Sequence, residues 1–136
     1  MRARGHGVVV NVSSDSARAP GPDDAAYGAS KAALGAFSES LALRLTGCGV
    51  RVHVLYPGWV PTATGLAMVD EGTITPPRSV SRSEEQVSHL LLSRLGSDRI
   101  DIDATWIARF APVARTFLPG LYRRGVLKAA GSIHPN

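Results

Sequence analysis

The chain has 136 residues, of which 44% are hydrophobic and 19% charged, and its 15 basic and 11 acidic side chains leave a formal net charge of +4. These values exclude a disordered or fibrous protein and allow one modest globular domain. The basic residues are scattered and aromatic residues are few, which does not favour nucleic-acid binding. Without a membrane-length apolar run or an N-terminal targeting segment, the sequence predicts a cytoplasmic protein.

The first predicted element is a strand over residues 7–12, an apolar run interrupted only by Asn11. Such runs are typical of strands buried on both faces of a parallel sheet. A loop rich in Pro, Gly and Asp follows at 15–24. Asp24 is positioned to cap a long amphipathic helix over 25–46, in which small residues fill the first half. The residues of this helix expected to face the core are Leu34, Phe37, Leu41 and Leu45.

A second strand is predicted at 50–55, so that strand, helix and strand form one parallel crossover unit. Residues 59–80 form a long loop rich in Gly, Thr and Pro, which we interpret as a substrate loop that covers a pocket. Ser81 and Glu84 have the spacing of a capping box at the start of a further helix.

The last predicted strand is short and covers 100–104. A C-terminal tail follows over 105–136, where Pro112 and Pro119 are expected to divide the chain into short helical pieces. No repeat, low-complexity tract or linker marks a second domain. We therefore expect residues 1–136 to form a single α/β domain.

Three polar residues have a spacing suited to proton transfer. Ser14 follows the first strand, Tyr27 comes thirteen residues later, and Lys31 lies four residues further on. That last interval places Tyr27 and Lys31 on one face of a helix. A nearby cation favours the phenolate and brings a tyrosine closer to the range in which it acts as a general base. Taken separately, each residue is more often structural than catalytic.

The strings NVSS and YGASKAAL around these residues resemble the active-site segment of the short-chain dehydrogenase/reductase (SDR) family. The resemblance implies an NAD(P)-dependent oxidoreductase that transfers a hydride between nicotinamide and an alcohol or ketone. It also implies that Tyr27 exchanges a proton with the substrate oxygen, that Ser14 orients this oxygen, and that Lys31 additionally bonds to the nicotinamide ribose. Ser13 is the weaker candidate for the catalytic serine because its interval to Tyr27 is one residue longer.

Residues 57–62, with the sequence PGWVPT, resemble the Pro-Gly-x-Val-x-Thr segment of the same family. In that family the segment contacts the nicotinamide carboxamide. The resemblance therefore implies a set of cofactor-binding residues that consists of Tyr27, Lys31, Pro57, Gly58, Val60 and Thr62. It does not distinguish NAD from NADP.

The resemblance implies an α/β fold with a partial Rossmann-like, doubly wound parallel sheet. The glycine-rich Thr-Gly-x-x-x-Gly-x-Gly turn and the Asn-Asn-Ala-Gly segment of the family are not found in the chain. We therefore interpret the chain as the C-terminal half of an SDR fold that lacks the N-terminal nucleotide-binding segment. Such a half is expected to bind NAD or NADP poorly by itself.

Two other hypotheses remain open. In the first, the chain is a catalytically inactive remnant that serves as an interaction module, with the 25–46 helix forming a homo-oligomer. Alternatively, the aromatic residues and arginines of the tail meet a membrane surface and admit an apolar substrate, although such a stripe is more often a core-facing helix. Cys48 is interpreted as structural. No metal site is predicted, because no metal-ligand spacing relates the four histidines, His6, His53, His89 and His134.

Overall fold

The computed structural model describes residues 1–63, 66, 76 and 78–133. Its strands β1 (Gly7–Val12), β2 (Val50–Tyr56) and β3 (Asp101–Asp103) form one parallel sheet in the order β1-β2-β3. The expected partial Rossmann-like sheet is thus present, and β2 is its central strand.

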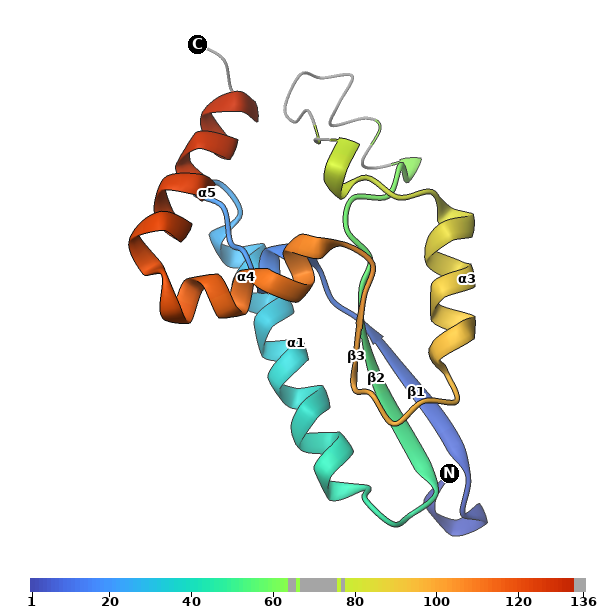
Figure 1. Cartoon of the computed structure of the whole chain (residues 1–136). Helices are drawn as coiled ribbons and strands as arrows, with labels where there is room; N and C mark the ends of the chain where they lie inside the picture. Colours follow the sequence, from blue (N-terminus) through green and yellow to red (C-terminus); the bar gives the residue numbers. More distant parts are fainter. Residues whose placement is uncertain (64–65, 67–75, 77, 134–136) are drawn as a thin grey trace.

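Four helices accompany the sheet among the described residues. Figure 1 shows α1 (Ala25–Arg44) and α3 (Glu84–Arg94) on opposite sides of the strands. The helices α4 (Trp106–Phe117) and α5 (Pro119–Ile133) meet at a bend and lie on the side of α1. None of the described helices has the length and apolar character that crossing a bilayer requires.

The side chains of β2 explain this arrangement. Successive residues of a strand point to opposite faces, and Val52 packs against Leu45 of the α1 side. The next residue, His53, is buried, and its Nδ1 and Nε2 atoms lie 2.8 and 3.2 Å from the carbonyl oxygens of Arg99 and Leu95. His53 is therefore a packing histidine that holds the end of α3 against the sheet.

The sequence prediction placed β1 in a fully buried position, and this was wrong. β1 has only β2 as a neighbour among the described strands, and the side chains of Val8 and Val12 are exposed. An apolar run in an edge strand cannot be told from one in a central strand by composition, because both positions favour the same β-branched residues.

The expected core-facing position of Phe37 was also wrong. Phe37 is exposed, whereas its neighbour Ser38 is buried. The Ser38 hydroxyl donates to the carbonyl oxygen of Leu34 at 2.6 Å and accepts from Nδ2 of Asn11 in β1 at 2.8 Å. The polar residue that interrupts the apolar run of β1 thus finds its partner on the inner face of α1.

Two predicted helix signals need correction. The capping box of α3 is formed by Ser83 and Gln86, while Ser81 pairs with Trp59 in an isolated parallel bridge. In the tail, α4 continues through Pro112, which removes one N–H donor from the helix without ending it. Pro119 does begin a new helix, at a position where the missing N–H has no helical partner to lose.

Candidate active site

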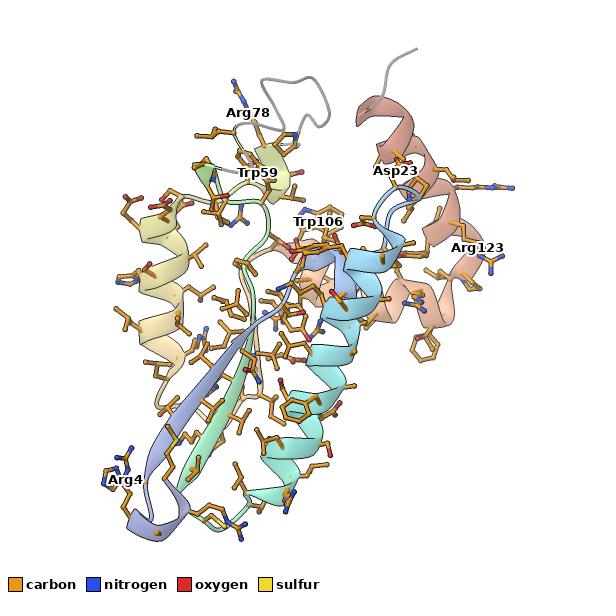
Figure 2. The ribbon with its side chains drawn as sticks, turned by 180° about the vertical axis from the view of Figure 1, so that it is seen from behind. Arg4, Asp23, Trp59, Arg78, Trp106 and Arg123 are labelled. Atoms are coloured by element: carbon orange, nitrogen blue, oxygen red, sulfur yellow. The ribbon has the colours of Figure 1, made fainter. Side chains whose placement is uncertain are left out.

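The candidate catalytic residues gather at the carboxyl edge of the parallel sheet. Ser14 follows β1 and opens a short turn, Tyr27 lies in the first turn of α1, and Pro57 and Gly58 follow β2. Figure 2 shows Trp59 at this same end of the molecule. In open parallel sheets, ligands bind outside the carboxyl ends of the strands. The fold therefore collects the predicted residues where a ligand is expected.

Tyr27 and Lys31 lie on one helix face, as their spacing predicts. The Lys31 Nζ atom lies 5.6 Å from the centroid of the Tyr27 ring and donates a hydrogen bond of 3.1 Å to the carbonyl oxygen of Val12. The Tyr27 side chain is half exposed. The strand end thus holds the ammonium group within cation–π distance of an accessible tyrosine.

The two serines after β1 make different contacts. Ser13 is buried, and its hydroxyl donates to the carbonyl oxygen of Lys31 at 2.9 Å. Ser14 is partly exposed, and its Oγ atom accepts from the backbone N–H of Ser16 at 3.2 Å. A hydroxyl that accepts one hydrogen bond still has its own O–H to donate. Ser13 therefore ties β1 to α1, whereas Ser14 retains a donor for another group.

A glycine permits the serine turn to approach the helix of Tyr27. A β-carbon at Gly28 would lie 3.1 Å from the carbonyl oxygen of Ser16, so a larger residue would push the turn outward. No hydrogen bond joins the hydroxyls of Ser14 and Tyr27 in the part of the chain that the structure describes. The structure brings the turn that Ser14 opens against Gly28, the residue after Tyr27, and leaves the two hydroxyls unbonded to each other.

The predicted cofactor segment forms a tight turn after β2. Gly58 has a φ angle of +75°, which favours glycine, and a β-carbon there would lie 2.5 Å from Cγ2 of Thr105 and 2.6 Å from the carbonyl oxygen of Val80. Further on, the N–H of Thr62 donates to the carbonyl oxygen of Val60 at 2.8 Å. Gly58 is thus required both by its backbone conformation and by the close approach of the segments around it.

Sequence reasoning missed a contact between Asp15 and Thr105. The Thr105 hydroxyl donates to Oδ2 of Asp15 at 2.5 Å and accepts from the backbone N–H of Ala108 at 3.1 Å, which caps α4. Burial raises the pKa of Asp15 above its ordinary value of 3.8, against the opposing effects of the Thr105 hydroxyl and the Gly58 amide. The start of α4 is thereby linked to the residue after Ser14.

Arg18 forms a second link between the serine turn and the sheet. Its guanidinium lies 3.9 Å from the centroid of the Tyr56 ring and pairs with Asp101 at 2.5 Å. The nearest Asp103 oxygen is 3.8 Å away, which is too long for a hydrogen bond. Burial raises the pKa of Asp103 and of Tyr56, more than the Arg18 charge lowers them. Arg18 therefore fixes the loop before α1 to β2 and β3.

Two open grooves lie among the described residues. The larger one, about 770 Å³, runs between α1 and α4 past the small residues Ala32, Gly35 and Ala36. Neither this groove nor the smaller one of about 410 Å³ at the other end of β2 includes Ser14, Tyr27 or Lys31. The predicted substrate loop at 59–80 falls largely outside the described residues, so its role as a cover stays a prediction.

The remaining candidates from the sequence are structural or unassigned. Cys48 is a free cysteine packed against the cluster of Leu45, Val50 and Val52. Within the described ranges, no three His, Cys, Asp or Glu side chains come together in a group that could hold a metal ion.

The chain matches the short chain dehydrogenase family over residues 1–71, which is more than half of its length. It therefore belongs to this family. It is 49% identical over 61 residues to 2,3-dihydro-2,3-dihydroxybenzoate dehydrogenase of Escherichia coli (strain K12), a match that covers 45% of this chain and 24% of that protein. It is 32% identical over 130 residues to dehydrogenase/reductase SDR family member 7B of Bos taurus, with 91% and 40% covered.

A solved structure shows the same fold. The short chain dehydrogenase from Burkholderia cenocepacia J2315 in complex with NADP superposes with a TM-score of 0.74 at 21% identity, over 93% of this chain and 49% of that one. At this identity the likeness establishes the fold alone. The chain spans less than half the length of each of these relatives.

The family match corrects one sequence-based prediction. We had interpreted the chain as the C-terminal half of the SDR fold, without its nucleotide-binding segment. The match instead begins at residue 1 and covers β1, α1 and β2, so the family similarity lies in the N-terminal part of this chain. This part is a parallel β-α-β unit, the unit from which Rossmann nucleotide-binding sheets are built. The assignment to a C-terminal half is therefore withdrawn, and the fold is described as a partial Rossmann sheet of the SDR family.

Proposed function

We propose that this chain carries the catalytic residues of an NAD(P)-dependent oxidoreductase that interconverts an alcohol and a ketone. The observation that carries the proposal is the accessible Tyr27 side chain with the Lys31 ammonium beside it, at the carboxyl edge of the sheet, where the turn that Ser14 opens packs against Gly28. The nicotinamide cofactor, when bound, supplies or accepts the hydride.

Each of the three residues has a distinct role in this proposal. The Tyr27 hydroxyl donates a proton to the substrate oxygen during ketone reduction and takes it back during alcohol oxidation. The positive charge of Lys31 stabilises the phenolate that remains on Tyr27. The free O–H of Ser14 donates a hydrogen bond to the substrate oxygen and holds it in reach of Tyr27.

The hydrogen-bond donors of the candidate site fit a nicotinamide cofactor. An ammonium group has three N–H donors, and the described contacts of Lys31 use one of them, toward Val12. Donors therefore remain for a ribose hydroxyl, while the Pro57–Thr62 segment lies at the same edge. The expectation of poor cofactor binding rested on the withdrawn assignment to a C-terminal half. The NADP complex of the Burkholderia cenocepacia relative makes NADP the first cofactor to test.

The proposal is tested by turnover of NADPH and NADH with a panel of simple ketones. Replacement of Tyr27 by Phe removes the proton donor and should lower the rate by roughly a hundredfold or more, because general acid catalysis contributes on that scale. The matched control is Tyr122→Phe on α5, where the hydroxyl is buried without a hydrogen-bond partner and its loss should leave the rate unchanged. Wild-type protein without turnover, or full activity in Tyr27→Phe, would contradict the proposal.

A second candidate function is an interaction module in which α1 pairs with another copy of the chain. It is favoured by the exposure of Phe37 and Leu43 on the outer side of α1. Sedimentation equilibrium should then show a homo-oligomer that Phe37→Asp converts to a monomer. A monomeric wild-type protein would exclude this role for the helix.

A further inference from the structure

α4 presents its large apolar side chains to the outside. Trp106, Phe110, Val113 and Phe117 lie at intervals of three and four residues, which places them on one face of the helix. All four are between 55% and 75% exposed. The residues toward the body of the protein are small, since Ala108 and Ala111 are the buried positions of this helix. We call the four exposed residues the α4 stripe.

The apolar surface continues beyond the end of α4. Leu118 at the bend and Leu121 and Leu127 on α5 are also exposed. Figures 1 and 2 show that α4 and α5 lie at the margin of the molecule, with α5 beside the loop that precedes α1. The α4 stripe is a continuous exposed apolar face, and a surface of this kind marks a contact with another molecule or with a membrane.

The charges of the same segment have one sign. Residues 104–136 contain five basic side chains and no acidic one, the basic residues being Arg109, Arg115, Arg123, Arg124 and Lys128. Figure 2 shows Arg123 on the outer side of α5. The partner of this surface is therefore expected to be anionic as well as apolar.

We propose that α4 and α5 bind the surface of an anionic lipid bilayer. An interfacial helix places aromatic and aliphatic side chains at the boundary of headgroups and acyl chains, while arginine and lysine extend toward the phosphates. The α4 stripe matches the apolar layer, and the exposed Arg123 and Arg124 of α5 match the charged one. A second copy of the chain would bring like charges together, and a nucleic acid would leave the α4 stripe without an apolar environment.

The start of α4 lies close to the candidate active site. Thr105 caps α4 and bonds to Asp15, the residue after Ser14. Trp106, the first residue of the α4 stripe, therefore starts at the carboxyl edge of the sheet. A bilayer bound along α4 lies beside this edge. An apolar alcohol or ketone dissolved in the lipid is then close to the candidate active site. The binding itself does not depend on the proposed function.

Co-sedimentation of the whole chain with phosphatidylcholine vesicles, with and without phosphatidylglycerol, tests the proposal. We expect binding to the anionic vesicles that weakens as salt is added. The double variant Arg123→Gln, Arg124→Gln should lower the partition coefficient by roughly tenfold or more, because each basic residue near an anionic surface contributes a severalfold factor. Phe110→Ser combined with Phe117→Ser should abolish most of the remaining binding.

The matched control is Leu92→Ser on α3, which removes a side chain that is 68% exposed and lies outside the α4 stripe. It should bind vesicles as the wild type does. In a Trp59→Phe background the only tryptophan left is Trp106, and its emission should shift to the blue with anionic vesicles. The proposal is overturned if the chain stays in the supernatant with both vesicle types, or if Leu92→Ser and the α4 variants bind vesicles equally. It is also overturned if the emission of Trp106 shifts to the blue only when DNA is added or when the chain self-associates.

Discussion

α1 and α4 lie on the same side of the sheet but pack in opposite ways. α1 packs Leu41 against the buried cluster of Leu45, Val50 and Val52, and it lies within the part of the chain that matches the family. α4 lies outside that match, turns the small Ala108 inward and leaves Phe117 exposed. The apolar contacts of α1 with the sheet are made inside this chain, whereas the largest apolar side chains of α4 are exposed. The two helices thus differ in what they turn inward: α1 packs Leu41 beside the sheet, whereas α4 buries only alanines.

The largest effect on stability is expected where the two regions meet, at Gly58. Replacement by Ala adds a β-carbon that collides with Thr105 and with the Val80 carbonyl oxygen, in a backbone conformation that already disfavours a side chain. We expect Gly58→Ala to lower the free energy of unfolding by about 2–5 kcal/mol, measured by urea denaturation.

Gly47 offers the matched control for that experiment. It also has a positive φ angle, +78°, but a β-carbon there would meet nothing within 4 Å. Gly47→Ala should therefore cost only the backbone strain, about 1–2 kcal/mol. Equal losses for the two variants would show that the close approach at Gly58 is absent.

Two valine substitutions compare how much buried and exposed apolar side chains contribute to stability. Val54 in β2 is buried, so Val54→Ala should destabilise the protein by about 2 kcal/mol. Val113 in the α4 stripe is 55% exposed, and Val113→Ala should change stability by less than about 0.5 kcal/mol. A comparable loss for both, in chemical denaturation without lipid, would mean that the outer face of α4 is covered within the protein itself.

The smallest expected effect is a pH dependence carried by the Asp15–Thr105 link. Because burial raises the pKa of folded Asp15 above 3.8, protonation favours the folded state. This contribution is complete below pH 3.8 and is lost as the pH rises through the raised pKa. Asp15→Asn keeps an acceptor for Thr105 but cannot ionise. Relative to that variant, the wild type should therefore lose stability as the pH rises, in urea titrations at several pH values; parallel curves would refute the assignment.

The strand–helix–strand unit could be predicted because its signals are local. The apolar runs at 7–12 and 50–55 and the long helical pattern between them became β1, β2 and α1. The four-residue spacing of Tyr27 and Lys31 likewise places them on one helix face without knowledge of the fold. Such features depend only on residues near one another in the chain.

Features that depend on distant residues were not predictable. The bond between Asp15 and Thr105 joins residues 90 positions apart. The exposure of Phe37 follows from the contact of Ser38 with Asn11, which no helical pattern reveals. The assignment to a C-terminal half relied on family motifs that were not found in the sequence. A missing motif is weaker evidence than a matched one for which part of a family fold a chain represents.

The central claim is that Tyr27, Lys31 and the Pro57–Thr62 segment form a nicotinamide site. Its most direct test is a titration of the chain with NADPH and NADH. Binding is monitored by energy transfer from tryptophan to the reduced nicotinamide, because Trp59 lies within this segment. The account predicts a saturable signal that weakens in Lys31→Met and persists in Tyr27→Phe. A signal that never saturates, or that is the same in Lys31→Met as in the wild type, would contradict it.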